Sequence, residues 1–131
     1  GRPEGDLQAP AEPGWAPLTW TFAGLWEIEP AALQELAGRV QVVDVRDAAE
    51  FAGPLGHVPG ARLLPLAQLA ARQVELQAGV PVVTVCRSGA RSAQAALQLA
   101  KAGVTDVANL AGGMLRWNAE RLPIEGASVE D

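Results

Sequence analysis

The sequence contains few of the residue types on which most active sites are built. Its 131 residues include one cysteine, Cys86, and one histidine, His57. A lone cysteine cannot form an intramolecular disulfide, so it is either inert or reactive, and a reducing, cytoplasmic setting fits it best. We find no metal-ligand spacing among His, Cys, Asp and Glu, and no glycine-rich nucleotide loop. We therefore expect no metal and no cofactor.

Long apolar runs and a surplus of positive charge are also missing. No stretch approaches the roughly 18 continuous apolar residues of a membrane-spanning helix. The net charge of −5 argues against nucleic acid as a partner. However, Glu75 is the only acidic residue between Phe51 and Thr105, where four arginines and a lysine fall. This basic middle indicates a site for a small anion, although chance clustering on a solvated face would give the same pattern.

The length and composition fit one globular domain. A chain of 131 residues, of which 49% are hydrophobic, is long enough for one core and short for two. Residues 1–17 hold four prolines and three glycines without periodicity, so we predict a Pro/Gly-rich arm or linker there. The domain itself is predicted to cover residues 18–131.

Short apolar runs alternate with helical patterns along this domain. The predicted strands cover residues 18–26, 40–45, 61–66, 80–85 and 107–110. The predicted helices cover residues 30–37, one turn at 47–51, 65–76 with Leu66, Leu69, Ala70 and Val74 on one face, 92–102 with Ala93, Ala96, Leu97 and Ala100 on one face, and a last helix carrying Met114 and Trp117. The alternation predicts an α/β fold, a three-layer arrangement of a mostly parallel central sheet with helices on both faces.

The single cysteine stands where such a sheet binds ligands. Cys86 follows the apolar run "VPVVTV", and ligands of parallel sheets bind beyond the carboxyl ends of the strands. In the loop "CRSGAR", Gly89 allows the sharp reversal, and backbone N–H groups of such loops converge on an anion. Together with the next helix N-terminus and two arginines, this loop is expected to lower the pKa of Cys86. The alternative is a buried, inert cysteine.

A thiolate in an anion-binding loop supports two chemistries. In phosphoryl or arsenate transfer, the loop holds a tetrahedral oxyanion around the sulfur. In sulfur transfer, the thiolate takes up a sulfane sulfur and the loop holds the resulting persulfide.

Four segments resemble the signatures of the rhodanese family in the expected order. They are "VVDVRDAAEF", "GHVPGA", "VCRSGARS" and "NLAGGMLRWNAERLPI". Over roughly residues 25–124 the chain is similar to a single-domain rhodanese, a thiosulfate-type sulfurtransferase. The resemblance implies that Cys86 thiolate takes a sulfur from thiosulfate or a related persulfide donor. The persulfide then passes it to cyanide or a thiol, a protein acceptor included.

The loop length favours sulfur transfer over the alternatives. Cysteine phosphatases, including those that share this fold, place their phosphate-binding arginine one residue further from the cysteine than Arg91 lies from Cys86. The shorter loop makes a tighter cradle, suited to one added sulfur atom. A disulfide-forming arsenate reductase would also need a second thiol, which the sequence lacks. A cysteine phosphatase or arsenate reductase is therefore disfavoured.

The resemblance assigns roles to the loop and to residues near it. The residues expected to bind substrate and persulfide are Arg87, Ser88, Gly89, Ala90, Arg91 and Ser92. Arg87 is expected to meet the sulfonate end of the donor, the alternative being a solvated arginine. Arg91 is expected to turn back to Asp44 and brace the loop, with direct substrate contact as the alternative. Arg46 is expected to pair with Glu50, four residues on.

Four other residues are read as structural. His57 is expected to be a turn residue that hydrogen-bonds backbone rather than a general base, because a thiolate formed by its loop needs no base. Gly112 and Gly113 are expected to form a tight turn into the last helix, and Trp117 to fill the core.

A second function class stays open. Rhodanese-like domains also occur as non-catalytic binding or regulatory parts of larger proteins, and the Pro-rich arm and missing initiator Met leave room for this. Such silent domains usually lack the cysteine, which is present here within a complete loop.

Overall fold

The structure, a computed structural model, describes residues 10–127. Its strands are β1 Thr19–Trp20, β2 Trp26–Ile28, β3 Gln41–Asp44, β4 Arg62–Leu63, β5 Val82–Val85 and β6 Val107–Leu110. Its helices are α1 Pro30–Glu35, α2 Ala48–Phe51, α3 Leu69–Arg72, α4 Ala90–Lys101 and α5 Gly113–Ala119, and the 3₁₀ turns η2 Leu66–Gln68 and η3 Gln73–Glu75 flank α3. None of the helices in the described part is long and apolar enough to cross a membrane.

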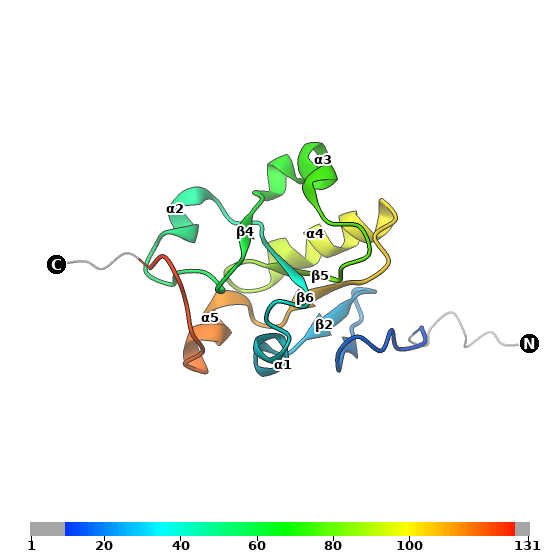
Figure 1. The fold of residues 1–131 in the computed structure, drawn as a ribbon, viewed down its shortest axis with the longest axis horizontal. Coiled ribbons are helices and arrows are strands. Elements are labelled where there is room, and N and C mark those ends of the chain that lie inside the picture. Colours follow the sequence, from blue (N-terminus) through cyan, green and yellow to red (C-terminus); the bar gives the residue numbers. More distant parts are fainter. Residues whose placement is uncertain (1–9, 128–131) are drawn as a thin grey trace, which may run out of the picture.

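One sheet organises the molecule. Its strand order is β1-β2-β6-β5-β3-β4, and every neighbouring pair is parallel except β1 and β2. All four residues of β5 and of β6 are buried, as expected of parallel strands covered on both faces. Helices α1 and α5 lie on one face of the sheet and α3 and α4 on the other (Figure 1). The predicted α/β fold with a mostly parallel sheet between helices is confirmed.

Each face of the sheet has its own apolar core. The core under α1 and α5 includes Ile28, Leu33, Val42, Val83, Val85, Leu110, Met114 and Trp117. The core under α3 and α4 includes Val43, Val45, Leu64, Leu69, Val82, Cys86, Ala95, Ala96 and Leu99. Because side chains alternate along a strand, β3 and β5 each contribute to both cores.

The parallel strands also gather their carboxyl ends at one edge. In the register of β3 and β5, Asp44 lies opposite Val85, so Cys86 begins the loop just beyond that pair. Helix α5 starts shortly after β6 ends at Leu110, at the same edge. The fold therefore brings the Cys86 loop beside the segments that follow β3 and β6.

The helix after Cys86 differs from the prediction in start and face. It begins at Ala90 rather than Ser92, because Gly89, with φ at 109°, turns the chain directly into the helix. Its buried residues are Ser92, Ala95, Ala96 and Leu99, so of the predicted face only Ala96 is fully buried. The face that packs on the sheet is shifted by one residue toward the N-terminus relative to the predicted face.

The predicted helix over residues 65–76 was also wrong in part. Helix α3 covers only four residues, between two 3₁₀ turns. Leu69 is fully buried, whereas Val74 is 86% exposed. No side chain caps these turns. Because tertiary packing stabilises most short helices, one fully buried residue flanked by the half-buried Leu66 and Leu76 does not sustain a continuous helix.

The N-terminal part of the domain forms a hairpin rather than one strand. Thr19 pairs with Glu27 and Trp20 with Trp26, and Gly24 takes a positive φ of 82° in the turn. Before this hairpin, Trp15 packs against the α1 and α5 core, so part of the predicted arm contacts the domain. Residues 1–9, the rest of that predicted arm, lie outside the described residues.

Candidate functional site

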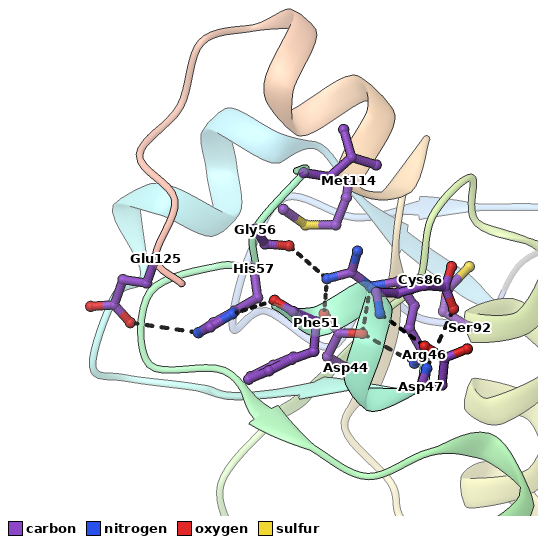
Figure 2. Close-up of polar contacts among 12 residues, drawn as sticks. Asp44, Arg46, Asp47, Phe51, Gly56, His57, Cys86, Ser92, Met114 and Glu125 are labelled. Atoms are coloured by element: carbon purple, nitrogen blue, oxygen red, sulfur yellow. Dashed lines mark hydrogen bonds and ion pairs between the residues drawn. The ribbon is translucent and has the colours of Figure 1, made fainter. Parts of the chain in front are cut away.

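Cys86 lies directly after β5, with its sulfur in the loop that follows. The sulfur accepts hydrogen bonds from the Gly89 N–H at 3.1 Å and from the Ser92 hydroxyl at 3.2 Å. Cys86 is only 1% exposed. Figure 2 shows the sulfur beside Ser92. The loop thus closes around the sulfur, and a reactant has to reach it with a small terminal group.

The surroundings of Cys86 lower its pKa, as the sequence predicts. Burial is the largest single influence and raises the pKa of the thiol. Hydrogen bonds from the Ser92 hydroxyl and from the backbone N–H groups of Ser92, Gly89 and Ser88 together outweigh it. The predicted direction is confirmed, but the dominant lowering influences are hydrogen bonds rather than the charges of Arg87 and Arg91.

Helix α5 holds the Cys86 loop from the other side. The N–H of Met114 donates to the carbonyl of Cys86 at 2.9 Å, and that of Leu115 donates to the carbonyl of Arg87 at 3.0 Å. A Cβ at Gly113 would lie 2.5 Å from both of these carbonyl oxygens, so only glycine permits the approach. The turn predicted at Gly112 and Gly113 is confirmed, with φ of 74° and 59°. Its contact with the loop was not foreseen.

Arg91 does not bind Asp44, so that prediction was wrong. Its two terminal nitrogens each donate to one oxygen of Glu50, both at 2.8 Å. The hydrogen bond from Arg91 is the main reason why the pKa of Glu50 falls to about 2. The loop is still braced by Arg91, but against α2 rather than against the end of β3.

The predicted pair of Arg46 with Glu50 was likewise wrong. Arg46 Nε and Nη2 donate to the two carboxylate oxygens of Asp44 at 2.9 and 2.8 Å, and Nη2 also donates to the Gly56 carbonyl at 2.7 Å (Figure 2). Both side chains are buried, at 1% and 0% exposure. Arg46 folds back onto Asp44, two residues before it, and leaves Glu50 to Arg91. The two predicted arginine–acid pairs are therefore exchanged.

His57 has the structural role that the sequence predicts. Its Nδ1 lies 2.9 Å from the carbonyl of Phe51, and its ring stacks on the Phe51 ring (Figure 2). Its backbone exchanges two hydrogen bonds with Glu125. Trp117 also behaves as predicted: it is 1% exposed, and its indole N–H donates to the Pro123 carbonyl.

The Arg87 guanidinium has no partner among the described residues. It is exposed, and within residues 10–127 its side chain makes no hydrogen bond or ion pair. It directly follows Cys86 in the loop. Arg87 is therefore the loop cation that is free to meet an anion.

Two residues that the sequence analysis missed complete the surroundings of the sulfur. The Ser92 hydroxyl lies 2.5 Å from Asn109 Oδ1, and Asn109 Nδ2 donates to the Gly89 carbonyl at 3.1 Å and to Glu27 Oε2 at 3.2 Å. Asn109 and Glu27 are register partners on β6 and β2. Asn109 opens the segment "NLAGGMLRWNAERLPI", but the resemblance gave it no role, and Glu27 lies outside the four segments, so only the sheet register reveals their place in the site.

The arrangement can stabilise a buried thiolate. The cradle supplies preorganised N–H and O–H donors to a sulfur, which is the means by which a site stabilises negative charge on a nucleophile. Within the described residues, no three His, Cys, Asp or Glu side chains gather as metal ligands would.

Comparison with known proteins places the chain in a family. A sulfurtransferase of Allochromatium vinosum is 42% identical over 85 residues, which are 65% of this chain and 78% of that protein. The thiosulfate sulfurtransferase GlpE of Pseudoalteromonas translucida is 34% identical over 80 residues, 61% of this chain and 74% of its own. Other curated relatives are longer, and the match covers 41% to 64% of three of them.

A solved structure and a family model agree with these relatives. The crystal structure of a rhodanese-related protein from Thermoplasma volcanium superposes with a TM-score of 0.71 at 26% identity, over 76% of this chain and 97% of that one. The family model described as the rhodanese-like domain matches residues 29–120, and that span contains Cys86 and the two residues that donate to its sulfur, Gly89 and Ser92. This chain belongs to the rhodanese-like domain family.

Proposed function

We propose that the protein is a sulfurtransferase that moves a sulfane sulfur from thiosulfate, or a related persulfide donor, to a thiophilic acceptor through a persulfide on Cys86. The observation that carries the proposal is the cradle around the Cys86 sulfur, which lowers the pKa of the thiol while enclosing it. Two relatives that bear the name sulfurtransferase support it. The proposal includes a reducing, cytoplasmic setting, which fits a lone cysteine best.

The proposed cycle has two displacement steps. In the first, the Cys86 thiolate attacks the outer sulfur of thiosulfate, a new S–S bond forms, and the old S–S bond breaks with its electron pair leaving on sulfite. In the second, cyanide or an acceptor thiolate attacks the outer sulfur of the persulfide. Thiocyanate or an acceptor persulfide leaves, and Cys86 recovers its electron pair as thiolate.

The loop residues divide the work of this cycle. The negative terminal sulfur of the persulfide is expected to be held by backbone N–H groups of the loop residues Arg87, Ser88, Gly89, Ala90, Arg91 and Ser92. Arg87 is assigned to the sulfonate end of the donor because its charge is free and stands next to the nucleophile. The Arg91 pair with Glu50 is assigned to bracing the loop, and the buried Asp44–Arg46 pair to holding the end of β3 against the Gly56 carbonyl.

A non-catalytic binding or regulatory domain is the second candidate. It is favoured by the relatives of which this chain spans only part. The complete cradle with its cysteine argues against it, because a purely structural domain has no need of a stabilised thiolate. A phosphatase remains disfavoured by the short interval between Cys86 and Arg91.

The test is the intact mass of the protein after incubation with thiosulfate, followed by a thiocyanate assay on addition of cyanide. We expect the mass to rise by one sulfur atom and thiocyanate to form, and both to be lost in Cys86→Ser. Turnover that survives in Cys86→Ser would refute the mechanism. An unchanged mass of the wild type with no thiocyanate would favour the regulatory domain, and Cys86-dependent turnover of an aryl phosphate would favour the phosphatase.

A further inference from the structure

A row of polar side chains crosses the sheet below the start of α4. In register, Glu27 of β2 lies beside Asn109 of β6, which lies beside Thr84 of β5. Asn109 is 1% exposed and Thr84 is fully buried. A buried polar residue needs hydrogen-bond partners, and those of Asn109 lead to the Cys86 cradle.

The hydrogen bonds around Asn109 determine which way its amide faces. The amide nitrogen stands near two groups that can only accept, the Gly89 carbonyl at 3.1 Å and the Glu27 carboxylate at 3.2 Å. Only an NH₂ group satisfies both of them. The amide oxygen must therefore face the Ser92 hydroxyl, which lies 2.5 Å away.

This orientation creates competition for one proton. The Ser92 oxygen carries a single hydrogen, and it lies within reach of both Asn109 Oδ1 and the Cys86 sulfur at 3.2 Å. When Cys86 is a thiol, its S–H can donate to Ser92, and Ser92 can donate to Asn109. When Cys86 is a thiolate, the sulfur and the amide oxygen both seek the same proton, because neither has one to offer.

We propose that Asn109 is a positioning residue that competes with the Cys86 sulfur for the hydroxyl proton of Ser92 and thereby limits how strongly the cradle stabilises the thiolate. In the thiol form, every donor between Cys86 and Glu27 has an acceptor. In the thiolate form, Asn109 Oδ1 gives up its partner, and this loss opposes ionisation.

One consequence rests on the proposed sulfur transfer. When the persulfide forms, the negative charge moves from the inner sulfur of Cys86 to the terminal sulfur. The Ser92 hydroxyl then no longer faces a charged acceptor, and it donates its hydrogen bond to Asn109 Oδ1 instead. When the acceptor removes the terminal sulfur, the inner sulfur regains the negative charge and again accepts the hydrogen bond from the Ser92 hydroxyl. The hydroxyl would thus alternate between two positions once in each half of the cycle.

The test needs no sulfur donor: the rate of alkylation of Cys86 by iodoacetamide is measured against pH. Asn109→Leu removes the competing oxygen at similar side-chain volume. In this variant we expect the midpoint of the curve of alkylation rate against pH to fall by about one pH unit, which is a tenfold change in the acid constant of the thiol. In the Ser92→Ala background the same substitution is expected to leave the midpoint unchanged, because the contested proton is absent.

Other charges around the sulfur stay in place in these variants, so they cancel in the comparison. They are Arg87 in the Cys86 loop, Glu50 on α2, Asp44 and Arg46 at the end of β3, Arg91 at the start of α4, and Glu27 on β2. Thr84→Val is the matched control, because the Thr84 hydroxyl donates to the backbone carbonyl of Ser92 at 2.8 Å and not to its side chain. We expect no shift in this variant.

Three results would overturn the inference: a midpoint that stays or rises in Asn109→Leu, equal shifts with and without the Ser92 hydroxyl, or an equal shift in Thr84→Val. If Asn109→Leu does not fold, Asn109→Asp replaces it. Its carboxylate should raise the midpoint more in the presence of the Ser92 hydroxyl than in the Ser92→Ala background, and equal rises would overturn the inference. Since the thiosulfate mass shift is measured separately, failure of sulfur transfer and failure of this competition are distinguishable.

Discussion

The two arginines of the Cys86 loop have different surroundings. Arg91 is bound by both oxygens of Glu50, and this pair neutralises its charge. Arg87 is exposed and has no partner among residues 10–127. A dianionic donor that approaches Cys86 therefore meets one unpaired cation in the loop, and that cation is adjacent to the nucleophile.

Replacing Arg87 is expected to impair both the binding of thiosulfate and its conversion. Arg87→Ala should raise KM for thiosulfate and also lower kcat, with a fall of more than about tenfold in kcat/KM, because the sulfonate binds with one negative charge and gains a second as it leaves as sulfite. Steady-state rates of thiocyanate formation measure both constants. Lys101→Ala is the matched control, since it removes the same charge at the far end of α4. An equal rise of KM in this control would mean that net charge, not contact, is responsible.

Only part of this site could be read from the sequence. Cys86, Gly89 and the arginines are neighbours in the chain, so their chemistry shows in a short segment. Asn109 reaches Glu27 across 82 positions, and only the register of β6 on β2 brings them together. Which acid an arginine selects was equally hidden, because it depends on how the side chains fold back after the strand ends.

Helices α2 and α4 are joined through one carboxylate. Glu50 Oε1 accepts the Asp47 N–H at 3.4 Å as part of the capping box of α2, and it also accepts from Arg91 in the first turn of α4. Helix α2 has four residues and buries none of them. Since so short a helix gains little from packing, its attachment to the Cys86 loop depends strongly on this bridge.

The bridge predicts an acid-dependent loss of stability. Arg91 lowers the pKa of Glu50 from 4.5 to about 2 in the folded protein. A lowered folded pKa contributes stability above the unfolded value, and this contribution disappears as the pH falls from 4.5 toward 2. Because Arg91 is 40% exposed, solvent screens the pair, and we expect Glu50→Gln to cost about 1 kcal/mol at pH 7.

Urea unfolding at pH 7 and at pH 2 measures this difference. At pH 2 the wild type and Glu50→Gln should approach equal free energies of unfolding, since the carboxylate is then protonated in the unfolded chain and about half protonated in the folded protein. Glu120→Gln, which removes an exposed partner of Arg116 on α5, is the control for general charge effects. A deficit of Glu50→Gln that is the same at both pH values would contradict the assignment of the bridge.

The helices also show where local patterns stop being informative. The end of α4 was readable, because Lys101 and Gly103 are typical of a helix C-terminus. Its start was not, since Gly89 takes a conformation that lets the helix begin before Ser92. In residues 65–76 the spacing predicted a buried Val74, but the segment contacts the core through Leu66, Leu69 and Leu76 and leaves Val74 exposed. The packing partner decides these features, and the partner is remote in sequence.

Across the whole molecule, the alternation of strands and helices predicted the layers but not the strand order. Nothing local indicates that β3 lies between β5 and β4, or β6 between β2 and β5. One buried group that links distant segments is the Asp44–Arg46 pair. Arg46 donates to the Gly56 carbonyl (Figure 2). The next residue, His57, pairs through its backbone with Glu125. The end of β3 is thereby tied to the C-terminal segment.

Breaking this pair is expected to destabilise the entire fold. Arg46→Met leaves the Asp44 carboxylate buried without a charged partner and should lower the free energy of unfolding by about 3–5 kcal/mol. The double variant Asp44→Leu with Arg46→Met removes both charges and should recover a large part of that loss, since a well-packed apolar pair often replaces a buried ion pair at little cost. Urea unfolding of both single variants and the double variant gives the coupling energy. Additive losses would show that the two side chains act independently, and the pair would then not be the link between β3 and the C-terminal segment.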